Sequence, residues 1–268
     1  MILFLSQQNG AAQCPFNKDF FSPKEFFTYD VHYAWGLIWL KGASMKMTTS
    51  ETTYNGTQAI KNSLFIQTTG AVKKIFYLSD TLSGIVSSDT FAPLFFKKAA
   101  HEDKTYSYEE IFYSYPPNEA KARLRHYRNN TLRGDTAFLS KTCFYDTMSL
   151  LHFFRSMDTE TLKKNKSVGV TLLFTDEAFN VTVTYKGIET IELDKEKIRT
   201  VKYTFSINGN AFENKKESIF LWMSDDNNHI PVQVETKLKI GSLKATLKKA
   251  SGCKNSCDAF PYNTKIVK

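Results

Sequence analysis

A basic run from Lys121 to Arg128, K-A-R-L-R-H-Y-R, carries the clearest chemical pattern in the sequence. Successive side chains of a β-strand point to opposite faces, so Lys121, Arg123 and Arg125 would share one face. Tyr127 would continue that face. Cations in such a row could bind phosphate or carboxylate groups, the arginines in a bidentate manner. The alternative interpretation is a solvated outer strand that its charge protects against edge pairing.

Trp35 and Trp39 form a second candidate binding site. Two tryptophans four residues apart on one strand would share a face and could stack against sugar rings. Gly36 lies between them and can shift the alternation of the strand. The alternative is that both rings belong to the core, where large aromatic side chains of β-proteins are more often found.

Established metal and enzyme motifs are absent from the sequence. No G-x-S-x-G, H-E-x-x-H, P-loop or dinucleotide-binding pattern occurs, and the oxygen-rich run Asp225–Asn228 lacks EF-hand spacing. His152 and Cys143 could still join an acid in a nucleophile system assembled in space. We expect no metal and no cofactor, and we favour a protein that is not an enzyme. The 5 histidines are scattered singly: His32, His101, His126, His152 and His229.

The stretch from Ser218 to Lys249 predicts the kind of structure that positions these residues. Its second run alternates apolar positions, Val232 to Ile240, with polar positions, Gln233 to Lys239, as a half-buried strand does. The run Asp225–Asn228 before it favours a turn, since Asp and Asn tolerate left-handed backbone. Pro231 is expected near the first position of the strand, and Gly241 at a turn or bulge. The whole stretch reads as an antiparallel meander.

The rest of the chain continues this pattern, with one helix. Asp146 is a plausible N-cap for a short helix that reaches Met157. Asn55-Gly56 and Asn208-Gly209 are strong hairpin turns, and Gly42 is expected to form a bulge. Ser87–His101 is ambiguous between a loop and a short helix. Further strands are predicted over Phe27–Trp35, Leu37–Met47, Ile60–Thr68, Val72–Leu78, Ser107–Tyr115, Ala120–Arg128, Val168–Thr175, Phe179–Tyr185, Ile188–Leu193 and Ile198–Ile207.

These elements predict one all-β domain, a large antiparallel meander sheet of about ten to twelve strands with one short helix. A twisted sheet of that size curls, so we expect a barrel or half-barrel. The length of 268 residues is sufficient for a self-contained core. The formal net charge of +8 favours acidic partners such as anionic lipid or polysaccharide. In an exported protein we expect no nucleic acid as partner.

The two ends of the chain and the cysteines give indications of the cellular compartment. Residues 1–12 resemble the remnant of a truncated signal peptide, with a mature start near Gln13, and no stretch is long and apolar enough to span a membrane as a helix. Residues 13–250 would form the domain, and residues 251–268 a basic tail. In an oxidising compartment the 4 cysteines allow three complete pairings, of which the local pair Cys253–Cys257 is one candidate. Cys14 also permits a lipoprotein interpretation, although Gln13 is not the small residue that lipidation normally requires.

The run Trp222–Pro231, W-M-S-D-D-N-N-H-I-P, followed by K-I-G-S-L-K-A at Lys239–Ala245, resembles the closing signature of the domain of unknown function 3108 family of exported Bacteroidetes proteins. The opening F-T-Y-D at Phe27–Asp30, with Tyr33, Trp35-Gly36 and Trp39, is similar too. The family usually has a glycine–glutamate pair before the first strand, and Pro23-Lys24-Glu25 departs from it. The resemblance spans about Phe20–Ala250. It implies a barrel-like meander in the cell envelope and supplies no activity.

We therefore expect a non-catalytic protein of the periplasm or cell envelope, in which association with the outer membrane is an option. It would bind an amphipathic or anionic ligand, a lipid or glycan, or an envelope protein partner. The alternative is an envelope glycan or lipid hydrolase. A dry apolar lining of the concave face would favour binding, and convergent acids and histidines would favour hydrolysis.

Overall fold

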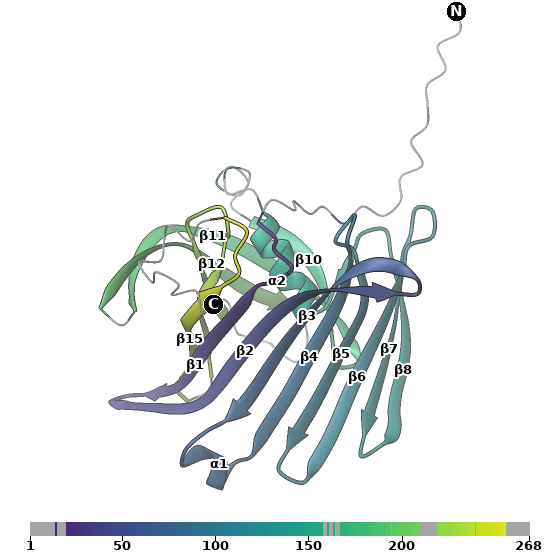
Figure 1. Ribbon diagram of the computed structural model, residues 1–268. Helices are drawn as coiled ribbons and strands as arrows, with labels where there is room; N and C mark the ends of the chain where they lie inside the picture. The colour runs from purple at the N-terminus through teal and green to yellow at the C-terminus, as the bar shows by residue number, and fades with distance from the viewer. Residues whose placement is uncertain are drawn as a thin grey trace, which may run out of the picture.

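The computed structural model of the protein describes Cys14 and residues 20–157, 160, 163, 167–193, 195–208, 219–238 and 240–255. Its strands form one 15-stranded sheet in the order β8-β7-β6-β5-β4-β3-β2-β1-β15-β14-β13-β12-β11-β10-β9. The pairs are antiparallel except for β9 and β10, which run parallel. The sheet rolls up into a nearly closed barrel, so the prediction of an all-β antiparallel meander is confirmed (Figure 1).

The first part of the sheet consists of β1 (Phe26–Trp35), β2 (Ile38–Tyr54), β3 (Thr57–Thr68), β4 (Leu78–Ser87), β5 (Pro93–Glu102), β6 (Thr105–Ser114), β7 (Ala120–Arg128) and β8 (Thr131–Ser140). The second part consists of β9 (Phe144–Tyr145), β10 (Ser167–Phe174), β11 (Glu177–Leu193), β12 (Glu196–Asn208), β13 (Ile219–Ser224), β14 (Pro231–Lys237) and β15 (Ser242–Ser251). Two short helices lie wholly within the described residues, α1 (Val72–Ile75) and α2 (Thr147–Ser156).

Local turn chemistry accounts for several connections. Asn55 and Gly56 both have positive φ, 50° and 80°, as the two central residues of a type I′ hairpin turn require. The register of β1 and β2 jumps from Val31↔Ala43 to His32↔Lys41 and leaves Gly42 unpaired, so the predicted bulge is confirmed. Bulges of this kind strengthen the twist of a sheet and so help it to roll up.

Two segments differ from the sequence-based predictions. The segment Val72–Leu78, predicted as a strand, begins with the one-turn helix α1, which has no buried residue. Its apolar residues fit either periodicity because the segment is too short to distinguish them. The ambiguous segment Ser87–His101 contains strand β5, which begins at Pro93, where a strand tolerates a missing N–H. Strands β4, β5 and β8, each 10 residues long, were not predicted from the sequence, and they raise the number above the predicted ten to twelve.

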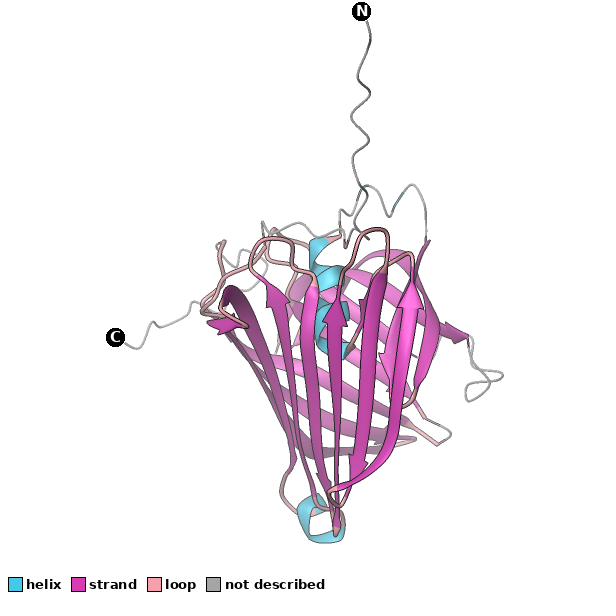
Figure 2. Cartoon of the chain, turned by 90° about the vertical axis from the view of Figure 1, so that its right-hand side faces the viewer, coloured by secondary structure: helices cyan, strands magenta, loops and turns pink. Residues whose placement is uncertain are grey.

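Helix α2 lies within the curl of the sheet, as Figure 2 shows. Its predicted N-cap is confirmed, since Asp146 Oδ1 accepts hydrogen bonds from the backbone N–H groups of Met148 (2.8 Å) and Ser149 (2.9 Å). Ser149 Oγ in turn accepts from the Asp146 N–H (2.9 Å), which completes a capping box. Tyr113 on β6 donates to Asp146 Oδ2 at 3.1 Å and so ties the helix to the sheet.

The Asp146→Ala variant is expected to lower the free energy of unfolding by about 2–3 kcal/mol, because it removes the N-cap and leaves the buried Tyr113 hydroxyl without its acceptor. Urea unfolding followed by circular dichroism measures this difference. The matched control is Asp89→Ala in the exposed β4–β5 turn, for which we expect a change within about 0.5 kcal/mol. Equal effects of the two substitutions would contradict the role of Asp146.

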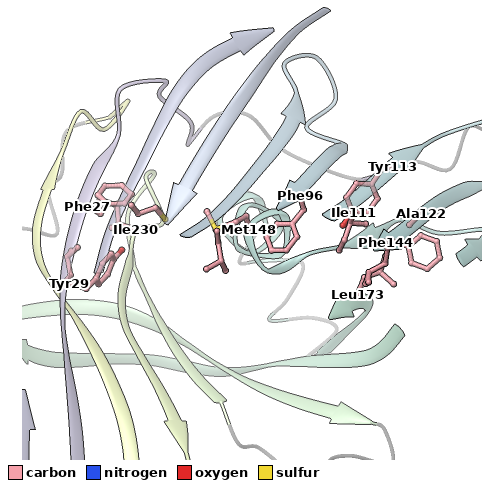
Figure 3. Packing of buried hydrophobic residues seen from close by; sticks show 14 of the residues in the cluster. Phe27, Tyr29, Phe96, Ile111, Tyr113, Ala122, Phe144, Met148, Leu173 and Ile230 are labelled. Atoms are coloured by element: carbon pink, nitrogen blue, oxygen red, sulfur yellow. The ribbon is translucent and has the colours of Figure 1, made fainter. Parts of the chain in front are cut away.

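The core lies on the concave face of the sheet. Figure 3 shows Met148 of α2 between two groups of buried residues, Phe27 and Ile230 on one side and Phe96 and Ile111 on the other. At the far edge, Phe144 and Leu173 of β9 and β10 belong to the same cluster as Ala122 and Leu124 of β7. The two ends of the meander are thus joined through inward-facing side chains, which nearly closes the barrel.

Candidate functional site

An apolar cavity of about 210 Å³ lies beside α2 inside the rolled sheet. One wall is α2 itself, a second wall comes from β2 and β3, and a third comes from β13, β14 and β15. The side chains that line it include Met45, Met47, Leu64, Leu151, Leu221 and Val234. A volume below the roughly 300–1,000 Å³ of sites for drug-sized molecules suits a single hydrocarbon chain better than a ring system.

Tyr29 lines the cavity without adding a free polar group to it. The Tyr29 hydroxyl donates a hydrogen bond to the Pro231 carbonyl oxygen at 3.0 Å and is buried there. The polar end of the side chain is therefore satisfied by the backbone, and the ring is left to line the cavity. Met45 and Met47 supply unbranched, polarizable side chains that adapt to ligands of varied shape.

A row of paired residues leads from this cavity to a polar region of the same concave face. The register pairs Leu64 with Leu82, Leu82 with Lys98, and Lys98 with Glu109. Glu109 in turn pairs with His126. Cross-strand partners share a face, so the row changes from apolar to polar between β4 and β5. It covers four inter-strand spacings, about 19 Å in all.

The polar end of the row is a mixed-charge cluster. Burial raises the pKa of the Glu109 carboxyl, and the positive charge of Lys98 lowers it to a smaller extent. His126 Nδ1 lies 3.4 Å from Asp176 Oδ2, at the turn between β10 and β11. Beyond it, an open groove of about 980 Å³ is lined by residues that include Ser107, His126 and Arg128. Acids, a histidine and cations thus converge where the concave face opens toward α1.

The predicted basic residues of β7 do share one face, and that face is the convex one. Arg123 makes a bidentate pair with Asp135 of β8, with both distances 2.7 Å. Arg125 Nε lies 3.3 Å from the same carboxylate, and Lys121 Nζ lies 3.2 Å from Glu119. An incoming anion would therefore compete with carboxylates of the chain for these cations. Tyr127 stacks on Tyr108 of β6, with ring centroids 4.3 Å apart.

The tryptophan pair is divided by the first hairpin. Trp35 ends β1 and pairs with Ile38, whereas Trp39 lies on β2 and pairs with Ala34. Because Gly36 and Leu37 form the turn between them, the two tryptophans lie on neighbouring strands and not four residues apart on one strand. The Trp39 ring is 54% exposed and stacks on His32 at 4.9 Å.

The cysteines give one disulfide among the described residues, between Cys14 and Cys143, with Cα atoms 5.5 Å apart. A sulfur in a disulfide is not available for lipid attachment, so this bond speaks against the lipoprotein interpretation of Cys14. The candidate pair Cys253–Cys257 is compatible with it, but Cys257 lies outside the described residues. Sequence alone left this choice open because the half-cystines are 129 residues apart.

The most deeply buried ion pair among the described residues was not predicted from the sequence. Arg155 of α2 and Glu25 form a bidentate ion pair at 2.7 and 2.6 Å, and both side chains are fully buried. Arg155 also donates to the Asn228 carbonyl oxygen at 3.0 Å. The signals in the sequence were an arginine within an apolar helix and a glutamate directly before the first strand.

The run Asp225–Asn228 is the loop that holds this pair, and its turn chemistry is confirmed. Asp226 Oδ1 accepts hydrogen bonds from the N–H groups of Asn228 (3.0 Å) and His229 (3.1 Å) and from the Ser224 hydroxyl (2.7 Å). Asn228 exchanges two hydrogen bonds with the backbone of Asn255, at 3.1 and 2.9 Å. The residues after β15 are thus attached to the loop between β13 and β14.

Within the described part of the chain, no group of three or more His, Cys, Asp or Glu residues is placed to hold a metal ion. No helix in that part is both long and apolar enough to cross a membrane.

The fold and the interior cavity define a β-barrel-like protein. The chain belongs to the family described as Protein of unknown function (DUF3108), which matches residues 28–248. The structure is similar to the crystal structure of a beta-barrel-like protein of domain of unknown function DUF1849 from Brucella abortus, with a TM-score of 0.53. The similarity covers 86% of this chain and 98% of that one at 9% identity, so it shows the fold alone. No curated protein matches the chain.

Proposed function

We propose that this protein is a non-catalytic binding protein of the cell envelope that holds the alkyl chain of an amphipathic ligand inside its rolled sheet. The observation that carries the proposal is the apolar cavity between α2 and the strands. A cavity lined by Leu, Met and Val side chains gains free energy when hydrocarbon replaces water, about 25 cal/mol for each Å² buried. The polar residues from Lys98 to His126 support the proposal that the ligand is amphipathic, because they offer contacts for a polar head group.

The cellular location is part of this proposal. The disulfide between Cys14 and Cys143 supports an oxidising compartment, since such bonds persist in the periplasm and outside the cell. The resemblance to exported Bacteroidetes proteins and the leader-like residues 1–12 point the same way; those residues lie outside the described part of the chain.

A fluorescent fatty acid, displaced by dodecanoate, tests the proposal. The Ala245→Phe variant places a ring in the cavity and is expected to weaken binding by at least about tenfold, equal to roughly 1.4 kcal/mol. The matched control is Ala137→Phe on the convex face of β8, which should bind like the wild type. Absence of binding by the wild type, or equal losses in both variants, would contradict the proposal.

The alternative, an envelope glycan or lipid hydrolase, is favoured by one observation. His126 lies against Asp176, and Ser107 lines the same groove, so a base, an acid that orients it and a hydroxyl occur together. This function requires that the wild type hydrolyse p-nitrophenyl butyrate. It also requires that both His126→Gln and Ser107→Ala lose this activity. Turnover that is absent, or unchanged in both variants, would remove it.

A further inference from the structure

Exposed apolar side chains gather on three connections of the sheet. The turn between β1 and β2 presents Leu37 fully to solvent, and the connection that contains α1 presents Ile75 at 85% exposure. The turn between β14 and β15 presents Ile240 at 60% exposure. Other large apolar side chains that are at least two-fifths exposed on these connections are Trp39, Leu40, Phe76, Leu238 and Leu243.

These three connections lie at one end of the rolled sheet. Strand β1 pairs with both β2 and β15, and the Tyr33 hydroxyl donates to the Ile240 carbonyl oxygen at 3.1 Å. The α1 connection is attached to β2, since the Thr69 N–H donates to the Gly42 carbonyl oxygen at 2.9 Å. Figure 1 shows the β1–β2 turn and α1 at the lower end of the molecule. Together they form one surface, which we call the tip surface.

The tip surface is basic as well as apolar. The described residues of the stretches 35–41, 69–77 and 237–244 contain five lysines and no aspartate or glutamate: Lys41, Lys73, Lys74, Lys237 and Lys244. Lys41 and Lys244 reach back to acids farther along the strands, Asp30 at 2.7 Å and Glu235 at 3.5 Å. Lys244 Nζ also lies 5.5 Å from the centroid of the Trp39 ring. Cations and exposed apolar groups are therefore interleaved.

We propose that the tip surface docks on an anionic lipid bilayer, with the apolar side chains entering the head-group region and the lysines facing lipid phosphates. A contiguous exposed apolar patch marks a binding surface, and a tryptophan beside lysines is typical of the membrane interface. Protein–protein interfaces are depleted of lysine, whereas lysines near an anionic membrane are favourable. The charge therefore favours lipid over a protein partner. This inference concerns a surface outside the cavity and does not depend on a ligand being bound there.

Co-sedimentation with large vesicles at low ionic strength tests the inference. We expect the wild type to bind equimolar phosphatidylglycerol–phosphatidylcholine vesicles and to be released by salt. Leu37→Asp and Ile75→Asp should each weaken binding by about tenfold, since an acid at the tip opposes both insertion and charge attraction. The matched control is Leu139→Asp on β8, which is 65% exposed and outside the tip surface, and it should bind within about twofold of the wild type.

Tryptophan fluorescence supplies a second readout. Trp35 and Trp39 lie in residues 35–41 of the tip and Trp222 is buried, so brominated lipids should quench the wild type, and should quench Trp39→Phe, which keeps Trp35, less. Failure to bind the anionic vesicles, an equal loss in Leu139→Asp, or binding without quenching would each overturn the inference. The Ala245→Phe variant separates the two proposals, because it should lose fatty acid and keep vesicle binding.

Discussion

Replacing Arg155 by methionine is expected to lower the free energy of unfolding by about 3–5 kcal/mol, because it leaves the Glu25 carboxylate buried without a partner. Glu25→Leu should have an effect of similar size, since it removes the carboxylate and leaves the guanidinium with the Asn228 carbonyl oxygen and the rings of Phe20 and Phe27. Both variants should unfold at lower urea concentration than the wild type. Circular dichroism in urea measures the difference.

The double variant Glu25→Leu/Arg155→Met separates the two contributions. Removing both charges together should recover a large part of the loss, because apolar side chains of similar volume avoid the cost of desolvating the ions. The matched control is Arg199→Met, which removes an exposed ion pair with Asp225 at 2.6 Å and should cost no more than about 1 kcal/mol. A cost for Arg155→Met as small as that for Arg199→Met would show that the buried pair does not hold α2 in place.

The second large effect concerns acid and His152. This side chain is 1% exposed, and within the described structure neither ring nitrogen has a hydrogen-bond partner. Burial, assisted by the charge of Arg155, lowers the pKa of His152 to about 3. The unfolded chain takes up a proton there near pH 6.5, so acidification favours unfolding. We expect a loss of about 1.4 kcal/mol for each pH unit between about 6.5 and 3 from this residue.

The His152→Phe variant tests this account, because phenylalanine keeps a ring between Phe20 and Phe91 and cannot be protonated. Its free energy of unfolding relative to the wild type should rise by about 1.4 kcal/mol for each unit that the pH falls below 6.5. The buried Asp146, whose pKa burial raises, is present in both proteins and cancels in the difference. Urea titrations at neutral and mildly acid pH measure the difference. A value that is independent of pH would contradict the account.

The features that the sequence predicted correctly are those that depend on near neighbours. The Asn55-Gly56 turn, the Gly42 bulge and the Asp146 cap each depend on the conformation or hydrogen bonds of a few adjacent residues. The alternation of β7 was correct for the same reason, since neighbouring side chains must take opposite faces. The alternation of side chains does not show in which direction the sheet curves. The sequence therefore did not predict whether Arg123 lies on the convex or the concave face.

The candidate site could not be predicted because distant strands build it. Leu64 and Val234 line one cavity only because β1 pairs with both β2 and β15, far apart in the sequence. Arg155 and Glu25 are 130 residues apart, and each alone is an ordinary charged residue in the sequence. The assumption that Trp35 and Trp39 lie on one strand was wrong for a local reason, because the turn at Gly36 places them on different strands.

The measurement that tests the central claim most directly is a crystal structure with 12-bromododecanoate, in which the bromine is located by its anomalous scattering. We predict a bromine site inside the cavity, within contact distance of Met47, Leu64 and Leu151, and its loss in crystals of Ala245→Phe. A bromine site confined to the outside of the sheet, or none at saturating ligand, would contradict the claim that the rolled sheet holds an alkyl chain.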